Sequence, residues 1–189
     1  MKYKLNNFLI DGIKAKILAK KYSTPLYCYS LKKIKDNIRN FQKSFESINP
    51  LVCFAVKANP NKIILRQMGR LGLGADVVSI GELMKALKSG IKPNKIVFSG
   101  VGKTSYELTY AIQKNILLIN AESKSEILEI EKIAKSKRKR VNVGVRLNPN
   151  TDAKTLSQIS TGKKENKFGI PEKDLLNLIK YIKNSKYLS

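Results

Sequence analysis

The chain has 189 residues, a length typical of one domain, and 42% of them are hydrophobic, enough for a packed core. Its apolar runs fall short of the ~20 residues that cross a bilayer, and residues 1–10 lack the apolar segment and cleavage site of a secretion signal. Two cysteines inside apolar runs suit a reducing cytosol, and the absence of histidine excludes a Ser-His-Asp relay and a His-ligated zinc site. We therefore expect a cytoplasmic protein with no membrane span and no metal site.

The formal charge of +23 raises the question of nucleic-acid binding. However, the basic residues are 31 lysines against 6 arginines, spread over the whole length, and a coding bias toward A/T-rich codons explains such an excess. Arginine, which makes bidentate contacts to bases and phosphates, is scarce. The one dense cluster, residues 135–140, contains no aromatic residue. A solvated surface is therefore favoured over a nucleic-acid site.

Apolar runs rich in β-branched residues recur along the chain and predict strands. The stretches between them carry apolar residues at helical spacing, as in residues 65–71. Ser79 with Glu82, and Ser123 with Glu126, predict helix starts that are closed by capping boxes. The predicted strands cover residues 25–29, 51–56, 75–78, 95–98, 116–119 and 141–147.

Strands that alternate with helices over short loops predict a parallel sheet, and their near-continuous apolar character predicts that both faces are covered. Two architectures fit this pattern, a doubly wound sheet and a (β/α) barrel. After the lead-in run at residues 25–29 there are five such strands, and residues 141–147 would be the last of the sheet. Residues 148–168 then form a polar stretch long enough to predict a functional or disordered loop.

Two glycine-containing segments mimic phosphate-binding loops but have the wrong spacing. Residues 99–104 end like a P-loop, yet Val97 stands where that motif needs glycine. Gly69, Gly72 and Gly74 precede a predicted strand, whereas the dinucleotide fingerprint follows one. Neither segment predicts a nucleotide site, although the first could still form a strand-end turn whose backbone N–H groups bind an anion.

Lys57 follows an apolar strand directly, in the segment of residues 54–60. In a parallel barrel the carboxyl end of a strand faces the mouth of the site. Burial there would favour the neutral, nucleophilic amine that a Schiff base with an aldehyde or carbonyl group requires. The alternative is a strand-end lysine that reaches solvent, and in a chain with 31 lysines the spacing alone favours that alternative.

A resemblance to a known family changes this balance. The sequence resembles the N-terminal half of the diaminopimelate decarboxylases, which are pyridoxal-phosphate-dependent enzymes with alanine-racemase-like barrels. The segment 99–104, together with 159–162 and 167–169, is more similar to this family than to ornithine decarboxylases or alanine racemases. The matching blocks lie in register along the chain, at residues 24–27, 55–59, 74–83, 98–104, 119–123, 145–149, 159–162 and 167–170.

The resemblance implies specific roles. Lys57 matches the lysine that holds pyridoxal phosphate as a Schiff base, Asp76 matches an acidic residue beside the cofactor, and Arg146 matches an arginine that lines the cofactor site. Metal ligands are not implied. Three further residues, Ser99, Asn120 and Glu122, fall at strand ends that face the same mouth. Ser99 could instead only form a turn, and Glu122 could merely support the next helix start.

Other side chains in the matching blocks are given structural roles. Lys103 is expected to be structural, and Lys167 to order its loop. Tyr27, Tyr29 and Phe54 are expected in the core.

The implied fold is α/β, a partial (β/α)₈ TIM barrel with about five of eight βα units. The C-terminal β-domain of the family would be absent. Residues 1–30 would form an N-terminal segment with a lead-in strand, and residues 31–189 an incomplete pyridoxal-phosphate-binding barrel. A complete barrel takes roughly 250 residues, so the chain looks truncated.

The implied activity is the decarboxylation of meso-2,6-diaminopimelate to L-lysine with pyridoxal 5'-phosphate, on a small amino-acid substrate. Members of the family are homodimers. Two alternatives remain open: a non-catalytic remnant, or half of a split enzyme whose second polypeptide supplies the rest. Another pyridoxal-phosphate-dependent amino-acid decarboxylase of the same fold is a further alternative. A role in binding nucleic acid or a membrane is not expected.

Overall fold

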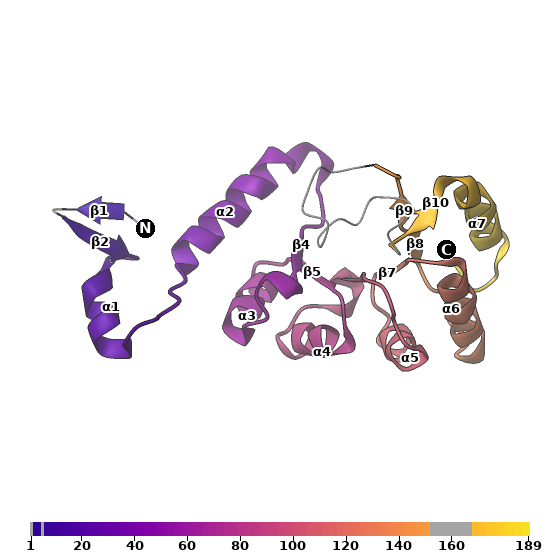
Figure 1. Ribbon diagram of the computed structural model, residues 1–189, viewed down its shortest axis with the longest axis horizontal. Coiled ribbons are helices and arrows are strands. Elements are labelled where there is room, and N and C mark those ends of the chain that lie inside the picture. The colour runs from indigo at the N-terminus through magenta and orange to yellow at the C-terminus, as the bar shows by residue number, and fades with distance from the viewer. Residues whose placement is uncertain (1, 5, 152–167) are drawn as a thin grey trace. The chain divides into compact units, whose positions relative to one another are not determined.

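The computed structural model describes residues 2–4, 6–151 and 168–189 (Figure 1). It divides into two compact units, Met1–Pro50 and Leu51–Ser189. The sequence-based division after residue 30 lies twenty residues earlier, and differs by the segment that contains one long helix. Among the described residues, no helix is both long and apolar enough to cross a membrane.

The N-terminal unit contains a small antiparallel sheet, two α-helices and a 3₁₀ turn, and has almost no core. Among its described side chains, Ser30 alone is buried. Ser30 accepts a hydrogen bond from the backbone N–H of Lys33 and donates one to Asp11, so it caps a helix and ties it to the sheet. The elements are β1 (Lys2–Lys4), β2 (Asn7–Ile10), β3 (Ile13–Lys14), α1 (Ala15–Tyr22), α2 (Leu31–Ser44) and η1 (Glu46–Ile48).

The lead-in strand predicted at residues 25–29 is wrong. These residues belong to no strand, because none of the described strands pairs with them. Tyr27 is 87% exposed and Tyr29 is also exposed, so neither lies in a core, whereas Phe54 is half-buried. An apolar run forms a strand only where a second strand offers hydrogen bonds, and the sequence pattern does not contain that information.

The C-terminal unit is built on a five-stranded parallel sheet with the order β4-β5-β6-β7-β8. Each consecutive pair of strands is joined by a helix, as the alternating pattern predicts, and the predicted α/β partial-barrel fold is confirmed. The strands are β4 (Cys53–Ala55), β5 (Gly74–Val77), β6 (Ile96–Phe98), β7 (Leu118–Ala121) and β8 (Val143–Val145). The helical elements are η2 (Val56–Ala58), α3 (Lys62–Arg70), α4 (Ile80–Lys88), η3 (Pro93–Lys95), α5 (Ser105–Gln113), α6 (Lys124–Ser136) and α7 (Glu172–Asn184).

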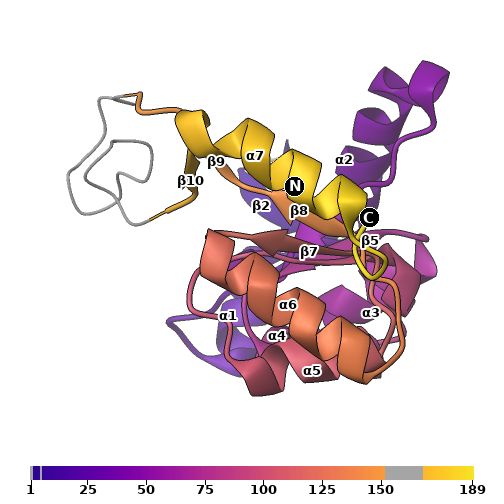
Figure 2. The ribbon, with the colours of Figure 1, turned by 90° about the vertical axis from the view of Figure 1, so that its right-hand side faces the viewer.

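The two faces of this sheet differ. Helices α3, α4, α5 and α6 lie along one face in both views (Figures 1 and 2). In the three central strands, β5, β6 and β7, every second residue points under these helices and is fully buried: Ala75, Val77, Ile96, Phe98, Ile119 and Ala121. The residues between them, including Asp76, Val97 and Asn120, are only half-buried. Complete cover of both faces, which the sequence predicts, therefore holds for one face only, and the other carries polar side chains.

The edge of the sheet at β8 is partly covered by the last residues of the chain. The N–H of Val141 donates to Tyr187 (2.9 Å), and the N–H of Val143 donates to Ser189 (2.8 Å). Leu188 pairs in parallel with Val141 and is fully buried. Residues 143–145 are the last strand of the five-stranded sheet, as the sequence predicts, but this edge is partly paired because α7 returns the chain to Val141 and Val143.

Beyond β8 a two-stranded parallel sheet joins β9 (Leu147–Asn148) to β10 (Ile170–Pro171). The residues between them include most of the predicted polar loop 148–168. The segment 159–162 and Lys167, which carry part of the family resemblance, lie outside the described residues.

Candidate active site

The polar residues identified from the sequence lie at one end of the sheet, where the strands have their carboxyl ends. All five strands are parallel, so their carboxyl ends meet there. Asp76 pairs with Val97 in the next strand, Ser99 stands two residues beyond Val97, and side chains two residues apart point to the same face. Across β7 and β8, Asn120 pairs with Gly144, and Arg146 stands two residues further on. The register therefore aligns these residues on the half-buried face.

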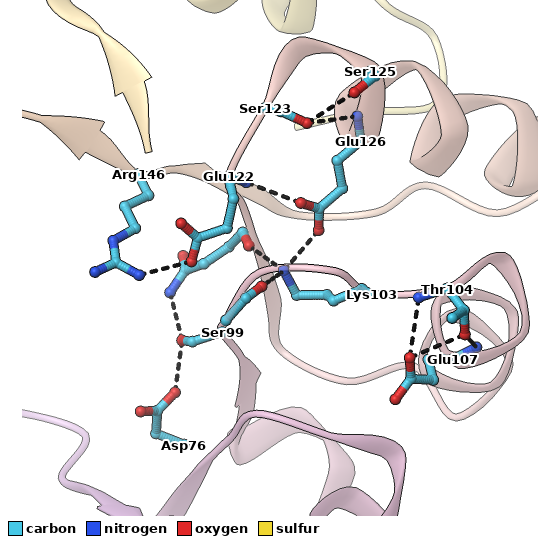
Figure 3. Close-up of polar contacts among 12 residues, drawn as sticks. Asp76, Ser99, Lys103, Thr104, Glu107, Glu122, Ser123, Ser125, Glu126 and Arg146 are labelled. Carbon is cyan, nitrogen blue, oxygen red and sulfur yellow. Dashed lines mark hydrogen bonds and ion pairs between the residues drawn. The ribbon is translucent and has the colours of Figure 1, made fainter. Parts of the chain in front are cut away.

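A row of hydrogen bonds links three of these side chains across three strands (Figure 3). The Ser99 hydroxyl donates to Asp76 Oδ1 at 2.6 Å, and Asn120 Nδ2 donates to the Ser99 hydroxyl at 3.0 Å. Gly144 makes room for the end of the row, because a Cβ at that position would overlap Asn120 Oδ1. Ser99 thus bridges Asp76 and Asn120 at the carboxyl ends of the strands.

Glu122 and Arg146 form an ion pair beside this row (Figure 3). Arg146 Nη1 donates to Glu122 Oε1 at 2.8 Å, and the guanidinium lies 5.1 Å from the centre of the Phe168 ring. The Glu122 side chain is 4% exposed and that of Arg146 is 38% exposed. Glu122 Oε2 is buried without a hydrogen-bond donor among the described residues. Glu122 therefore serves Arg146 and not, as its position suggested, the start of a helix.

The helix starts are held by other groups. Ser123 caps α6 by accepting from the N–H of Glu126, whose carboxylate accepts from the N–H of Glu122. The Glu82 carboxylate likewise accepts from the N–H of Val78, the residue before the cap. In both predicted capping boxes the acidic side chain thus reaches one residue further back than the motif requires. This ties the end of each strand to the following helix.

Lys103 is the buried centre of the loop between β6 and α5. Its ammonium donates to the carbonyls of Gly100 (2.6 Å) and Asn120 (2.7 Å) and to Glu126 Oε1 (2.6 Å). Its side chain is 1% exposed, and the ammonium lies 5.6 Å from the centre of the Phe98 ring. An ammonium has three N–H donors, and each has a partner here. The structural role that the sequence suggested for Lys103 fits this geometry.

The start of α5 is fixed by a full capping box that the sequence analysis missed. Thr104 accepts from the N–H of Glu107, and Glu107 accepts from the N–H of Thr104 at 3.0 Å. The second oxygen of Glu107 accepts from the N–H of Ile80, at the start of α4. The hydrogen bond from the Thr104 backbone, more than any other contact, lowers the pKa of Glu107 below its ordinary value of 4.5. The sequence Thr-Ser-Tyr-Glu fits the capping-box pattern, so the signal was present.

Lys57 lies in the turn η2, directly after β4. Its side chain is exposed and makes no hydrogen bond or ion pair with any described residue. The expectation that Lys57 is buried is therefore wrong for this structure, in which its side chain is exposed in the 3₁₀ turn. Lys57 shares the carboxyl-end edge with Asp76 and Arg146, but the structure shows no contact between it and either of them.

Two other features help to define the site. Burial, and after it the Asp76 carboxylate, raises the pKa of the Cys53 thiol above its ordinary value. A cavity of about 410 Å³ lies between the beginnings of α6 and α7, and Glu122 and Tyr181 are among its lining residues. Lys57, Asp76 and Arg146 do not line that cavity, so it does not coincide with the predicted site.

The model of one protein family, "pyridoxal-dependent decarboxylase, pyridoxal binding domain", matches residues 31–188. The chain belongs to this family. Among curated members, the diaminopimelate decarboxylase of Helicobacter pylori J99 is 50% identical over 167 residues, which are 88% of this chain and 41% of the relative. That of Campylobacter jejuni is 43% identical over 173 residues, 92% of this chain and 43% of the relative.

Solved structures of pyridoxal-dependent decarboxylases superpose closely. Diaminopimelate decarboxylase from Helicobacter pylori, complexed with L-lysine, has a TM-score of 0.87 at 46% identity and covers 92% of this chain and 44% of that one. The enzyme from M. jannaschii, also in complex with L-lysine, has a TM-score of 0.89 at 39% identity and covers all of this chain and 45% of that one. The chain therefore spans about two fifths of the length of the relatives it matches.

The described residues fit the pyridoxal cofactor that the family name implies. Lys57 offers a primary amine with no competing partner, which a Schiff base with an aldehyde requires. Arg146 donates one hydrogen bond of its guanidinium to Glu122 and is partly exposed, so further donors are available to an anionic group. The pairing of Glu122 with Arg146 was not predicted, because residues 24 positions apart carry no local signal of contact.

Proposed function

We propose that this chain supplies the pyridoxal-phosphate-binding part of a diaminopimelate decarboxylase, which releases CO₂ from meso-2,6-diaminopimelate and forms L-lysine. The observation that carries the proposal is the 50% identity to a diaminopimelate decarboxylase over 88% of the chain. Within that region, the exposed Lys57 and the polar row lie at the same edge of the sheet.

In this proposal Lys57 holds the cofactor covalently, and Asp76 and Arg146 contact it. When bound, pyridoxal phosphate supplies an electron sink for the electron pair that remains as CO₂ departs. The Lys57 side chain is long and has no polar partner among the described residues, so its amine would be free to move aside for the amine of the substrate and to return when the product leaves. Asp76 is fixed by the Ser99 hydroxyl, which is itself fixed by Asn120, so the acidic group keeps one orientation.

The chain covers 41% of its Helicobacter relative, so we infer that catalysis needs further residues, either later in the same polypeptide or on a second one. A homodimer and a cytoplasmic location complete the proposal. If no polypeptide supplies the missing residues, the chain is a non-catalytic remnant.

Three preparations test the proposal: the 189-residue chain alone, the chain fused to the remaining segment of the Helicobacter relative, and the same fusion with Lys57→Ala. CO₂ release from meso-diaminopimelate is measured, with L-lysine, L-ornithine and L-arginine as competing substrates. We expect activity on diaminopimelate from the fusion, and none from the chain alone or from the variant. Turnover by the chain alone would contradict the requirement for further residues, and a preference for another amino acid would contradict the substrate.

A further inference from the structure

Glu122 is a buried residue that links two charged groups, Lys103 and Arg146. The backbone N–H of Glu122 donates to Glu126 Oε2 at 3.0 Å, while Glu126 Oε1 accepts from Lys103. The Glu122 side chain then accepts from Arg146. A chain of polar contacts thus runs from the buried Lys103 to the partly exposed guanidinium at the site edge (Figure 3).

A carboxylate that is 4% exposed is costly unless a charged partner and hydrogen bonds compensate it. Glu122 has one such partner, through one oxygen, and its Oε2 is buried with no donor among the residues that the structure describes. A buried polar atom without a partner is rare in folded proteins and is retained where it serves a specific purpose. A residue that served only the packing of β7 would not need a charge here.

The geometry of Arg146 shows what that purpose is. A guanidinium and a carboxylate can form two parallel hydrogen bonds, which would occupy two of the five N–H donors. Here the pair forms one, through Nη1, and the guanidinium also lies over the Phe168 ring. Glu122 and Phe168 thus orient the guanidinium, and most of its donors have no partner among the described residues.

We propose that Glu122 is a positioning residue: its fixed carboxylate holds the Arg146 guanidinium in the orientation that receives the cofactor. This inference rests on the proposed function, in which Arg146 contacts pyridoxal phosphate. Glu122 acts through Arg146 and does not itself touch the cofactor. Its own position is set by Glu126 and, through Glu126, by Lys103.

The test compares Glu122→Gln, Arg146→Met and the double variant with Glu129→Gln as the matched control. Glu129 lies on α6, and its ion pair with Lys132 is at the surface, so the control removes the same charge away from Arg146. Two quantities are measured on the 189-residue chain: the dissociation constant for pyridoxal phosphate, and the rate at which phenylglyoxal modifies Arg146, determined by mass spectrometry. The other five arginines are exposed and serve as internal references.

We expect Glu122→Gln to weaken pyridoxal phosphate binding about tenfold, the scale of a hydrogen bond to a charged group. Arg146→Met should weaken it as much, and the double variant no further, because both changes remove one interaction. Phenylglyoxal should modify Arg146 several-fold faster in Glu122→Gln, and Glu122→Asp, which keeps the charge, should partly restore protection. Thermal unfolding of each variant separates these effects from a loss of folded protein.

Additive losses in the double variant, or an unchanged rate of Arg146 modification in Glu122→Gln, would overturn the inference. The two proposals fail differently. If the unmodified chain does not bind pyridoxal phosphate, the proposed function of this chain fails, while the phenylglyoxal rates still decide whether Glu122 holds Arg146. If binding is normal in Glu122→Gln and lost in Arg146→Met, the function stands and the positioning role fails.

Discussion

Two lysines follow strands of the same sheet, but their side chains differ in exposure and in polar partners. Lys57, after β4, is exposed and has no polar partner among the described residues. Lys103, after β6, is 1% exposed, and each of its three N–H donors has an acceptor. A nucleophilic amine must reach a carbonyl group, which an amine held by three acceptors cannot do. The surroundings therefore support the proposed cofactor-binding role of Lys57 and a structural role of Lys103.

The largest expected effect comes from exchanging each lysine for methionine. Lys103→Met leaves the Glu126 carboxylate buried without its charge partner, and we expect the free energy of unfolding to fall by about 3–5 kcal/mol. Lys57→Met, at an exposed side chain, should change it by less than about 0.5 kcal/mol. Denaturant unfolding of both variants measures the difference. Equal losses would remove the contrast between the two segments.

A methyl group at Gly144 should disturb the Lys103 segment from the neighbouring strand. The Cβ of Gly144→Ala would overlap the side chain of Asn120. The backbone carbonyl of the same residue accepts a hydrogen bond from Lys103. Forced repacking of this kind costs about 1–3 kcal/mol. Gly81→Ala, in α4, meets nothing closer than 3.8 Å and should stabilise the chain slightly, as alanine does in a helix. The opposite signs should appear in the melting temperatures, and a neutral Gly144→Ala would mean that Asn120 is not held as described.

The smallest effect concerns pH. The Thr104 backbone lowers the pKa of Glu107 in the folded chain, so this carboxylate contributes stability above its unfolded pKa of 4.5 and loses it as pH falls through the lower, folded pKa. The contribution should be about 1 kcal/mol or less, the scale of a helix cap. Glu107→Gln should therefore reduce stability at pH 7 and flatten its decline below pH 4.5. An unchanged acid limb would contradict the capping role.

The sequence predicted the sheet better than the site. Periodic apolar runs located all five strands of the parallel sheet to within a few residues, and in β5, β6 and β7 the alternate residues are buried under helices. The same logic failed at residues 25–29, where an apolar run has no strand to pair with. Strand ends identified Ser99 and Asn120, whereas Asp76 was implied by the family resemblance, and the parallel register aligns all three.

Contacts that depend on side-chain direction were not predictable. The pair of Glu122 with Arg146 joins two strand ends through rotamers that no local pattern encodes. Lys57, for which the sequence predicted burial at a barrel mouth, is exposed in the 3₁₀ turn after β4. By contrast, Glu107 was missed although its capping pattern is visible in the sequence. The Glu122–Arg146 pair and the exposure of Lys57 depend on tertiary geometry, whereas the Glu107 capping box is a local signal.

We propose that, of the 31 lysines, Lys57 is the one that binds pyridoxal phosphate. The direct test is to incubate the chain with pyridoxal phosphate, reduce it with borohydride, and locate the label by peptide mass spectrometry. Lys57→Met is the control that removes the proposed site, and heat-unfolded chain is the control for non-specific labelling. We expect the label to be concentrated on Lys57, with none on Lys103. Label spread evenly over the exposed lysines, or concentrated on another one with Lys57 unmodified, would contradict it.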